Sequence, residues 1–272
     1  MGNLTIITVT YLDHRLHTPM YFFLSNLSFL DISSISVTIP KLLDILLHNS
    51  YHISVNGCFT QLYFFLSLAS VELLLLTIMA YDRYVAICHP LRYSVIMSQR
   101  LCLQMAAGTW LIGFLETVAY PVLFTHLSYC GSNQINHFFC DLSALPKLSC
   151  TSTSNIEHVT YILGVFIETP CFFLILISYI HIISSILRIN SVEGRRKAFS
   201  TCASHLTVVI LFYGTMMCLY LRPTSIQSPE QNKFFALLYN VLIPLLNPLI
   251  YSLKNKDVKQ AIQKAFHRKL FS

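Results

Sequence analysis

Six long apolar segments constrain the fold of this chain more than any other feature of its sequence. In windows of about 19 residues they lie near residues 21–47, 57–81, 101–125, 158–187, 198–221 and 233–252. Each is long enough to cross a hydrocarbon core of roughly 30 Å as an α-helix. The composition agrees, because 54% of the residues are hydrophobic and only 11% are charged, less charge than a soluble surface requires. We therefore expect an all-α, polytopic membrane protein.

A seventh apolar segment, residues 2–12, is shorter and is followed by Asp13. At about 1.5 Å per residue it reaches roughly half of the bilayer, so the sequence predicts a truncated first helix. No signal peptide replaces it, since no basic region precedes an apolar one. We expect a single seven-helix domain, residues 1–272, with helices near 2–12 (partial), 18–47, 57–83, 101–125, 156–187, 197–221 and 232–252, and a short amphipathic helix at 255–266 on the inner leaflet.

The positive charges indicate how the chain lies in the membrane. Alternating the loops between two sides places all of the 18 Lys and Arg residues on one side, except Lys41, Lys147, Arg222 and Lys233. Positive residues concentrate on the cytoplasmic side of membrane proteins. We therefore expect a cytoplasmic C-terminus and an extracellular N-terminus. The net charge of +6 follows topology and does not indicate a nucleic-acid partner.

An acid–base pair, Asp82-Arg83, stands at the cytoplasmic end of the third of the seven expected helices. A guanidinium at this depth must snorkel to water or pair with a carboxylate, and Asp82 is adjacent. If that pairing can break, the helix end is a switch. The alternative is a boundary arginine that holds the helix at the headgroups, and these two residues alone do not decide between them.

Acidic residues also occur inside the apolar segments. Asp31, Glu72 and Asn247 could converge on a hydrated cation such as sodium, because hard oxygen ligands suit such ions. A protonated, hydrogen-bonded structural cluster is the equal alternative. Glu116 and Glu168 are either neutral at depth or part of a polar patch in a ligand cavity, and the former is favoured.

Four of the nine cysteines, Cys58, Cys130, Cys140 and Cys150, fall on the expected extracellular side. An oxidising compartment permits disulfides there, and four cysteines allow three connectivities. A zinc site that includes His137 is the competing interpretation. The cysteine spacing lacks the close pair of common zinc modules, so disulfides are favoured.

Two rows of residues at helical spacing lie at similar depth in the outer half. One row belongs to the third of the seven expected helices and the other to the sixth. If they face one another, they line an apolar cavity with a few hydroxyls, as small-molecule pockets do; spacing alone favours ordinary core. The candidate ligand-binding residues are Leu62, Phe65, Leu66, Ala69 and Ser70 in the first row, Tyr213, Met216, Met217 and Tyr220 in the second, and, with a weaker signal, Leu163, Ile167, Leu237 and Asn240.

Five strings of residues occur in an order typical of one family: 19–24 with 27–31, 79–88, 197–206, 212–214 and 244–251. With them the chain resembles an odorant receptor of the rhodopsin-like G-protein-coupled class over nearly its whole length. The resemblance implies disulfides Cys58–Cys140 and Cys130–Cys150, and it favours the cavity interpretation of the two rows. The departure is at the amino end, where such receptors carry an extracellular tail and the outer half of the first helix.

The resemblance also implies roles for residues near the cytoplasmic face. Arg83 would be the latch that contacts the G protein, and Asp82 its resting partner. The implied coupling and activation switch consists of Asp82, Arg83, Tyr84, Tyr179, Asn247, Pro248 and Tyr251.

We therefore expect a plasma-membrane odorant receptor. A small, mostly apolar volatile ligand would bind the outer cavity and activate a heterotrimeric G protein with an olfactory, stimulatory α subunit, which raises cAMP. Membrane lipid is the other expected partner, sodium the only candidate cofactor, and no catalytic motif predicts an enzyme. The alternatives are a non-signalling truncated remnant retained in the endoplasmic reticulum and, less favoured because no internal repeat is evident, a secondary transporter.

Overall fold

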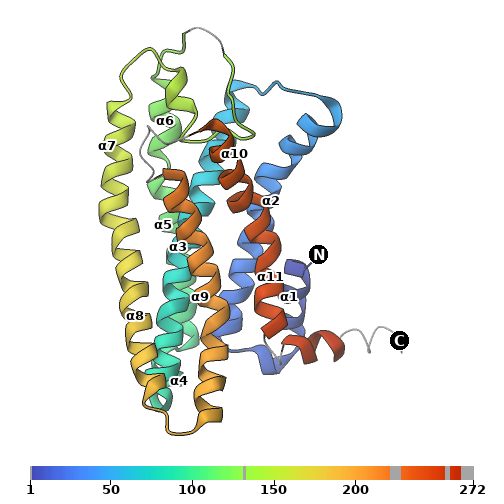
Figure 1. Ribbon diagram of the computed structural model, residues 1–272, viewed down its shortest axis with the longest axis vertical. Coiled ribbons are helices and arrows are strands. Elements are labelled where there is room, and N and C mark those ends of the chain that lie inside the picture. The colour runs from blue at the N-terminus through green and yellow to red at the C-terminus, as the bar shows by residue number, and fades with distance from the viewer. Residues whose placement is uncertain (1, 131–132, 221–227, 255–257, 265–272) are drawn as a thin grey trace.

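The computed structural model describes residues 2–130, 133–220, 228–254 and 258–264, and long helices run side by side through them as one bundle (Figure 1). Among these residues, six helical spans are long and apolar enough to cross a membrane. The only pairing of extended backbone within them is an isolated bridge between Tyr129 and Ser149. The expected all-α membrane fold is confirmed.

The elements follow one another in this order: α1 (Gly2–Leu12), η1 (His14–Leu16), α2 (Pro19–His48), α3 (Val55–Cys88), η2 (Pro90–Arg92), α4 (Tyr93–Ile96), α5 (Gln99–Glu116), α6 (Ala119–Thr125), η3 (Leu145–Leu148), α7 (Ser154–Leu163), η4 (Gly164–Glu168), α8 (Thr169–Leu187), α9 (Val192–Tyr220), α10 (Pro229–Leu237), η6 (Leu238–Leu242) and α11 (Ile243–Lys254). The turns η4 and η6 are π-helical. They interrupt helices without ending them, so α7 to α8 and α10 to α11 each form one continuous rod.

Helix boundaries follow local capping chemistry. Ser54 and Ser98 accept hydrogen bonds from backbone N–H groups three residues later, at 3.1 and 3.4 Å, and so cap α3 and α5. Pro19 occupies the first turn of α2, where its missing N–H costs nothing. Asn49 ends the same helix with φ of 51°, a left-handed conformation that asparagine tolerates well.

The structure departs most from the predicted boundaries in three places. α3 continues to Cys88, because no helix breaker occurs before Pro90. The expected fourth helix is interrupted after Glu116, where Pro121 has no N–H to donate to the carbonyl of residue 117. α9 begins at Val192 instead of 197, because Ser191 accepts from the Gly194 N–H at 3.1 Å. Of the expected amphipathic helix, residues 258–264 are helical, and the remainder lies outside the described residues.

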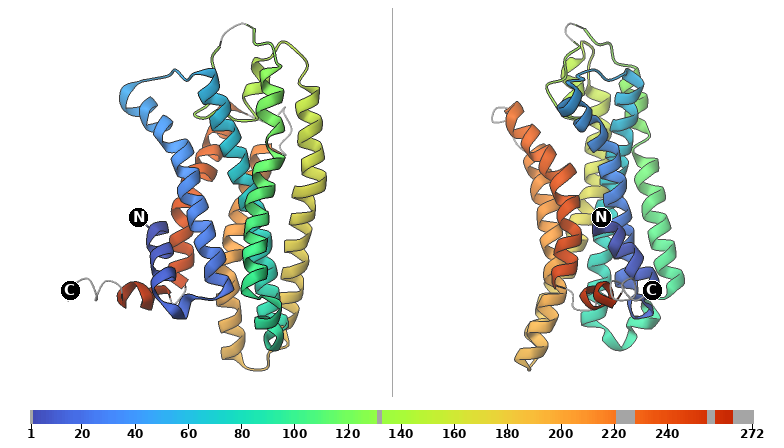
Figure 2. Two further views of the ribbon diagram at one scale, coloured as in Figure 1. Left: turned by 180° about the vertical axis from the view of Figure 1, so that it is seen from behind. Right: turned by 90° about the vertical axis from the view of Figure 1, so that its right-hand side faces the viewer.

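Helix α3 is the centre of the bundle and packs against α2, α5, α8 and α9. Its close approach to α5 requires Gly113, where an added Cβ would lie 2.6 Å from Val71 Cγ2. Beside this contact the hydroxyls of Ser67 and Thr117 are 2.5 Å apart. The short helix α1 lies against α2 and α11, as both views of Figure 2 agree.

A proline explains how α1 is attached. Pro248 lies inside α11 and cannot donate to the carbonyl four residues before it. That carbonyl, of Pro244, instead accepts from Asn3 Nδ2 at 3.2 Å. A neighbouring helix thus satisfies a backbone group that would otherwise be unpaired inside the membrane.

Candidate functional site

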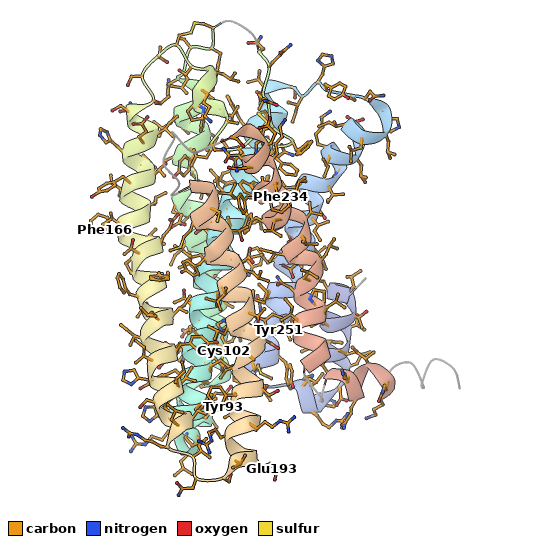
Figure 3. All side chains as sticks on the ribbon, viewed as in Figure 1. Tyr93, Cys102, Phe166, Glu193, Phe234 and Tyr251 are labelled. Atoms are coloured by element: carbon orange, nitrogen blue, oxygen red, sulfur yellow. A yellow bond between two sulfur atoms is a disulfide. The ribbon has the colours of Figure 1, made fainter. Side chains whose placement is uncertain are left out.

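The C-terminal end of α3 carries a buried ion pair. Arg83 Nη2 lies 2.8 Å from Asp82 Oδ2, and their side chains are only 8% and 1% exposed. The second carboxylate oxygen accepts a hydrogen bond from the Tyr93 hydroxyl at 2.7 Å. Burial, and then the nearby Asp82 charge, raises the pKa of Tyr93, so its hydroxyl stays protonated and remains a donor. Asp82 therefore accepts hydrogen bonds both from Arg83 and from Tyr93 of α4. Figure 3 shows Tyr93 near this end of the bundle.

A second buried contact, deeper in the bundle, joins three helices. The rings of Tyr179 in α8 and His205 in α9 are stacked, 5.8 Å apart between centroids. Tyr179 Oη lies 2.7 Å from His205 Nδ1, and His205 Nε2 lies 3.1 Å from the carbonyl oxygen of Leu76 in α3. Because a carbonyl can only accept, Nε2 carries the proton and Nδ1 accepts from the tyrosine. Sequence reasoning named Tyr179 as a switch residue and included His205 only within the string 197–206, where it is the one imidazole among small and hydroxyl-bearing residues.

The candidate cation site is partly brought together. Asn247 Nδ2 lies 2.9 and 3.2 Å from the two carboxylate oxygens of Asp31. Glu72 instead accepts from the Tyr239 hydroxyl at 3.1 Å. Glu72 Oε1 and Asn247 Oδ1 are buried without a hydrogen-bond partner among the described residues. No group of three or more His, Cys, Asp or Glu side chains in the described ranges is arranged to hold a metal ion.

The remaining predicted switch residues lie in different surroundings. Tyr251 is buried, and its hydroxyl has no partner in the part of the chain that the structure describes. Pro248 lies against the position of Gly2 in α1. Tyr84 contacts His89, 3.1 Å from its hydroxyl, and the ring of His181, so it borders the ion pair without joining it.

In the half of the bundle away from the ion pair, aromatic rings connect α3, α9 and η6. Phe65 packs edge-on against Tyr239 at 6.0 Å, and Phe212 packs against the same ring at 5.7 Å. Tyr213 packs against Phe172 at 5.2 Å, and its hydroxyl is buried without a partner among the described residues. Sequence reasoning identified Phe65 and Tyr213. It missed Tyr239, Phe212 and Phe172, whose signal was only an aromatic residue in an apolar helix.

The other predicted ligand residues divide between two apolar clusters. Leu62 belongs to a cluster that includes Cys58 and Cys140. Leu163 packs against that cluster, and Leu66 contacts both clusters. Those in or against the main core are Ala69, Ile167, Met216 and Leu237.

The polar and outward-facing candidates behave differently. Ser70 donates to Glu116, and Asn240 donates to its own helix at Ala236. Met217 is 46% exposed, so it faces away from the bundle. The side chain of Tyr220 lies outside the described residues.

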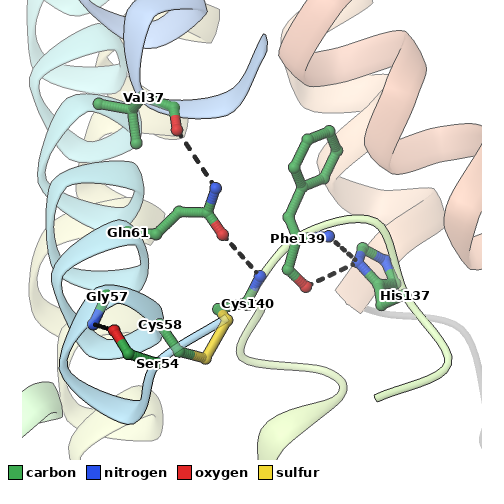
Figure 4. Close-up of a disulfide and its surroundings, with 8 residues drawn as sticks. All are labelled: Val37, Ser54, Gly57, Cys58, Gln61, His137, Phe139 and Cys140. Carbon is green, nitrogen blue, oxygen red and sulfur yellow. Dashed lines mark hydrogen bonds between the residues drawn. A yellow bond between two sulfur atoms is a disulfide. The ribbon is translucent and has the colours of Figure 1, made fainter. Parts of the chain in front are cut away.

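A loop closes the end of the bundle opposite the ion pair (Figure 1). The structure contains disulfides Cys58–Cys140 and Cys130–Cys150, the two pairings that the resemblance implies. Gln61 supports the first, because it donates to the Val37 carbonyl at 3.2 Å and accepts from the Cys140 N–H at 3.0 Å (Figure 4). The loop is therefore tied to α3 and, through the same glutamine, to α2.

His137 lies in this loop beside Phe139, with its Nδ1 3.1 Å from the carbonyl oxygen and 3.3 Å from the amide nitrogen of that residue. Burial lowers the pKa of His137. Lys233 of α10 donates to Asn136 at 2.5 Å and so fixes the loop to the last transmembrane rod.

A bundle of apolar helices with a buried ion pair at one end and a disulfide-tethered loop at the other defines a multi-pass membrane protein. A family model described as olfactory receptor matches residues 1–269. Olfactory receptor 13F1 of Homo sapiens is 49% identical over 272 residues, which cover 100% of this chain and 85% of that protein. Olfactory receptor 226 of Rattus norvegicus is 50% identical over 269 residues, which cover 97% and 82%.

The chain belongs to the olfactory receptor family. It is therefore a member of a receptor class that signals and does not catalyse a reaction.

Proposed function

We propose that this odorant receptor binds a small, mostly apolar volatile molecule in its outer half and activates a heterotrimeric G protein through an olfactory, stimulatory α subunit. The observation that carries the proposal is the buried Asp82–Arg83 pair, held by Tyr93 at the end of the central helix. A charged pair is costly to bury unless its hydrogen bonds are satisfied. Loss of one partner would release Arg83 from this arrangement, which makes the pair suited to a two-state switch.

The rings of Phe65, Phe212 and Tyr239, called here the outer aromatic group, supply the proposed place for the ligand. Phe65, Phe212 and Tyr239 provide apolar surface from three elements. The buried Tyr213 hydroxyl can pair with an oxygen atom of a ligand. A ligand changes the equilibrium only if it binds one of the two states more tightly.

The path between the two ends runs through contacts shared by neighbouring helices. Tyr239 contacts Phe65 and Phe212 and also donates to Glu72 of α3. Deeper in the bundle, the Tyr179–His205 contact joins α8 and α9 to the Leu76 carbonyl. A ligand that displaced Tyr239 would therefore disturb the contact of α3 with η6. The proposed orientation places the disulfide-tethered loop outside the cell and the ion pair in the cytoplasm.

A sodium ion held by Asp31, Glu72 and Asn247 is part of the proposal. Two unpartnered buried oxygen atoms, Glu72 Oε1 and Asn247 Oδ1, support it, because sodium prefers oxygen ligands. The thermal midpoint of the purified receptor should rise when choline chloride is replaced by sodium chloride at equal ionic strength. The Asp31→Asn variant should lose that rise; an equal rise in both proteins would contradict the site.

The function is tested by the cAMP response of cells that express an olfactory-type G protein and are exposed to an odorant panel. The receptor and its Arg83→Ala variant are compared at equal surface density, with cells lacking the receptor as the control. The proposal expects at least one odorant to raise cAMP through the receptor and the variant to lose that response. Full surface expression with no response to any panel member, or an equal response from both chains, would count against it.

A further inference from the structure

A cavity of about 830 Å³ lies at the cytoplasmic end, away from the outer aromatic group. It is lined by the end of α1, the start of α2, α4 and the first turns of α5. Its volume is within the range of small-molecule sites. Nothing in the proposed odorant or G-protein site accounts for it.

The cavity is mostly apolar, and the imidazole that lines it, His17, has its Nε2 3.2 Å from the Tyr11 carbonyl oxygen. None of the described residues that line it is Asp, Glu, Lys or Arg. Apolar surface comes from Leu16, Phe22, Met97 and Leu103. Such a lining opposes a charged ligand, including a phospholipid headgroup, because a charge removed from water needs a partner.

Two hydroxyl groups indicate what the cavity recognises. Thr10 and Ser25 both line it, and Thr10 is only 8% exposed. The hydroxyl oxygens of both are buried and have no hydrogen-bond partner among the described residues. A buried hydroxyl without a partner costs free energy. Rotation about χ1 would turn these hydroxyls into the cavity that the two residues line. A ligand that carries an acceptor oxygen would then satisfy both donors, whereas a lipid acyl chain would leave them unpaired.

From these observations we infer a second binding site, for a small, uncharged, mostly apolar molecule with one alcohol or carbonyl oxygen. The molecule would enter from the inner leaflet and place its oxygen against Thr10 and Ser25 and its apolar part against Phe22 and Leu103. Tyr93 lines the same cavity.

The site is next to the switch, because Tyr93 also donates to Asp82 at 2.7 Å. A ligand packed on the Tyr93 ring stabilises the arrangement in which Asp82 is held. Occupancy of the site should therefore lower the response to an odorant. This consequence rests on the proposed function, whereas binding itself does not.

Binding is tested with 3-azioctanol, a photoreactive octanol, on the full chain in nanodiscs of phosphatidylcholine without sterol. Saturable labelling should map to the cavity-lining segments 16–25 and 93–103, and excess octan-1-ol should displace it. Thr10→Val and Ser25→Ala each remove one donor with little change of volume. Each should raise the 3-azioctanol concentration that gives half-maximal labelling by roughly three- to tenfold. Thr8→Val is the matched control, since Thr8 is exposed on the same helix, and it should label like the wild type.

Unsaturable labelling, or equal labelling of both donor variants and the wild type, would overturn the site. So would labelling that cholesterol displaces and octan-1-ol does not, because a sterol would then be the occupant. The thermal midpoint without ligand provides a folding check: removing an unpaired hydroxyl should not lower it. If labelling behaves as expected and octan-1-ol leaves the odorant-induced cAMP unchanged, the link to the switch is wrong while the site stands.

Discussion

The contact of α5 with the central helix α3 makes a prediction whose size can be worked out from the structure. A Cβ added at Gly113 would lie 2.6 Å from Val71 Cγ2, 2.9 Å from the Val71 backbone nitrogen and 3.2 Å from the Ser67 carbonyl oxygen. A valine side chain can rotate, but the backbone atoms of α3 cannot move without the helix. Gly113→Ala therefore forces the two helices apart. Overpacking of this kind costs about 1–3 kcal/mol.

The same helix contains a matched control. Gly108 has nothing within 4 Å of an added Cβ, so Gly108→Ala changes only the intrinsic helix propensity, a gain of about 1 kcal/mol. Gly113→Ala receives the same gain, and the difference between the two variants isolates the clash. We expect Gly113→Ala to unfold at a midpoint about 2–12 °C below that of Gly108→Ala, at roughly 2–4 °C for each kcal/mol.

Thermal unfolding in nanodiscs, followed by intrinsic fluorescence, measures the difference. Trp110 is the single tryptophan of the chain and lies between the two glycines in α5. Its indole donates to Asn26 Oδ1 of α2 at 3.2 Å, so its emission reports on this part of the bundle. Equal midpoints for the two variants would refute the close packing of α3 and α5.

Three further predictions concern the switch and the loop. Tyr93→Phe removes the hydrogen bond to the charged Asp82 carboxylate, worth about 1.5–3 kcal/mol. Because this bond helps to hold the resting Asp82–Arg83 pair, basal cAMP at matched surface density should rise in the variant. An unchanged basal level would show that Asp82 does not need this bond. Cys58→Ser opens a loop of 82 residues, whereas Cys130→Ser opens one of 20. Chain entropy therefore predicts that Cys58→Ser loses about 1 kcal/mol more stability than Cys130→Ser. Thermal unfolding of the oxidised proteins measures the difference, and the reverse order would contradict it. Because burial lowers the pKa of His137 in the folded state, the unfolded state binds its proton first, and stability should fall as pH falls from about 7 through the lowered pKa. The midpoint difference between pH 7.5 and 5.5 should shrink in His137→Gln, and an equal difference in both proteins would oppose the assignment.

The membrane helices could be predicted because each is specified by its own residues. A run of apolar residues longer than the bilayer forms a helix whatever surrounds it, since the backbone must satisfy its own hydrogen bonds. The boundaries were less certain where short-range chemistry competed. Ser191 extends α9 by capping it, and Pro121 interrupts the expected fourth helix; both signals were present in the sequence and were outweighed by the apolar pattern.

The site was harder to predict because its partners are distant in sequence. The adjacency of Asp82 and Arg83 made their pairing evident, but nothing local links Asp82 to Tyr93, eleven residues later and beyond a helix end. His205 and Leu76 are 129 residues apart. Such contacts arise from helix rotation and packing, which the residue pattern of a single helix does not determine.

The central claim is that an odorant acts through Arg83 on the nucleotide-binding state of a G protein. The most direct measurement is GTPγS binding to a purified olfactory-type heterotrimer, with the receptor in nanodiscs and an odorant that binds both the wild type and Arg83→Ala equally. The account predicts that the odorant accelerates nucleotide exchange severalfold with the wild type and leaves the variant at the receptor-free rate. Equal acceleration by both proteins, or none by an odorant-bound wild type, would contradict it.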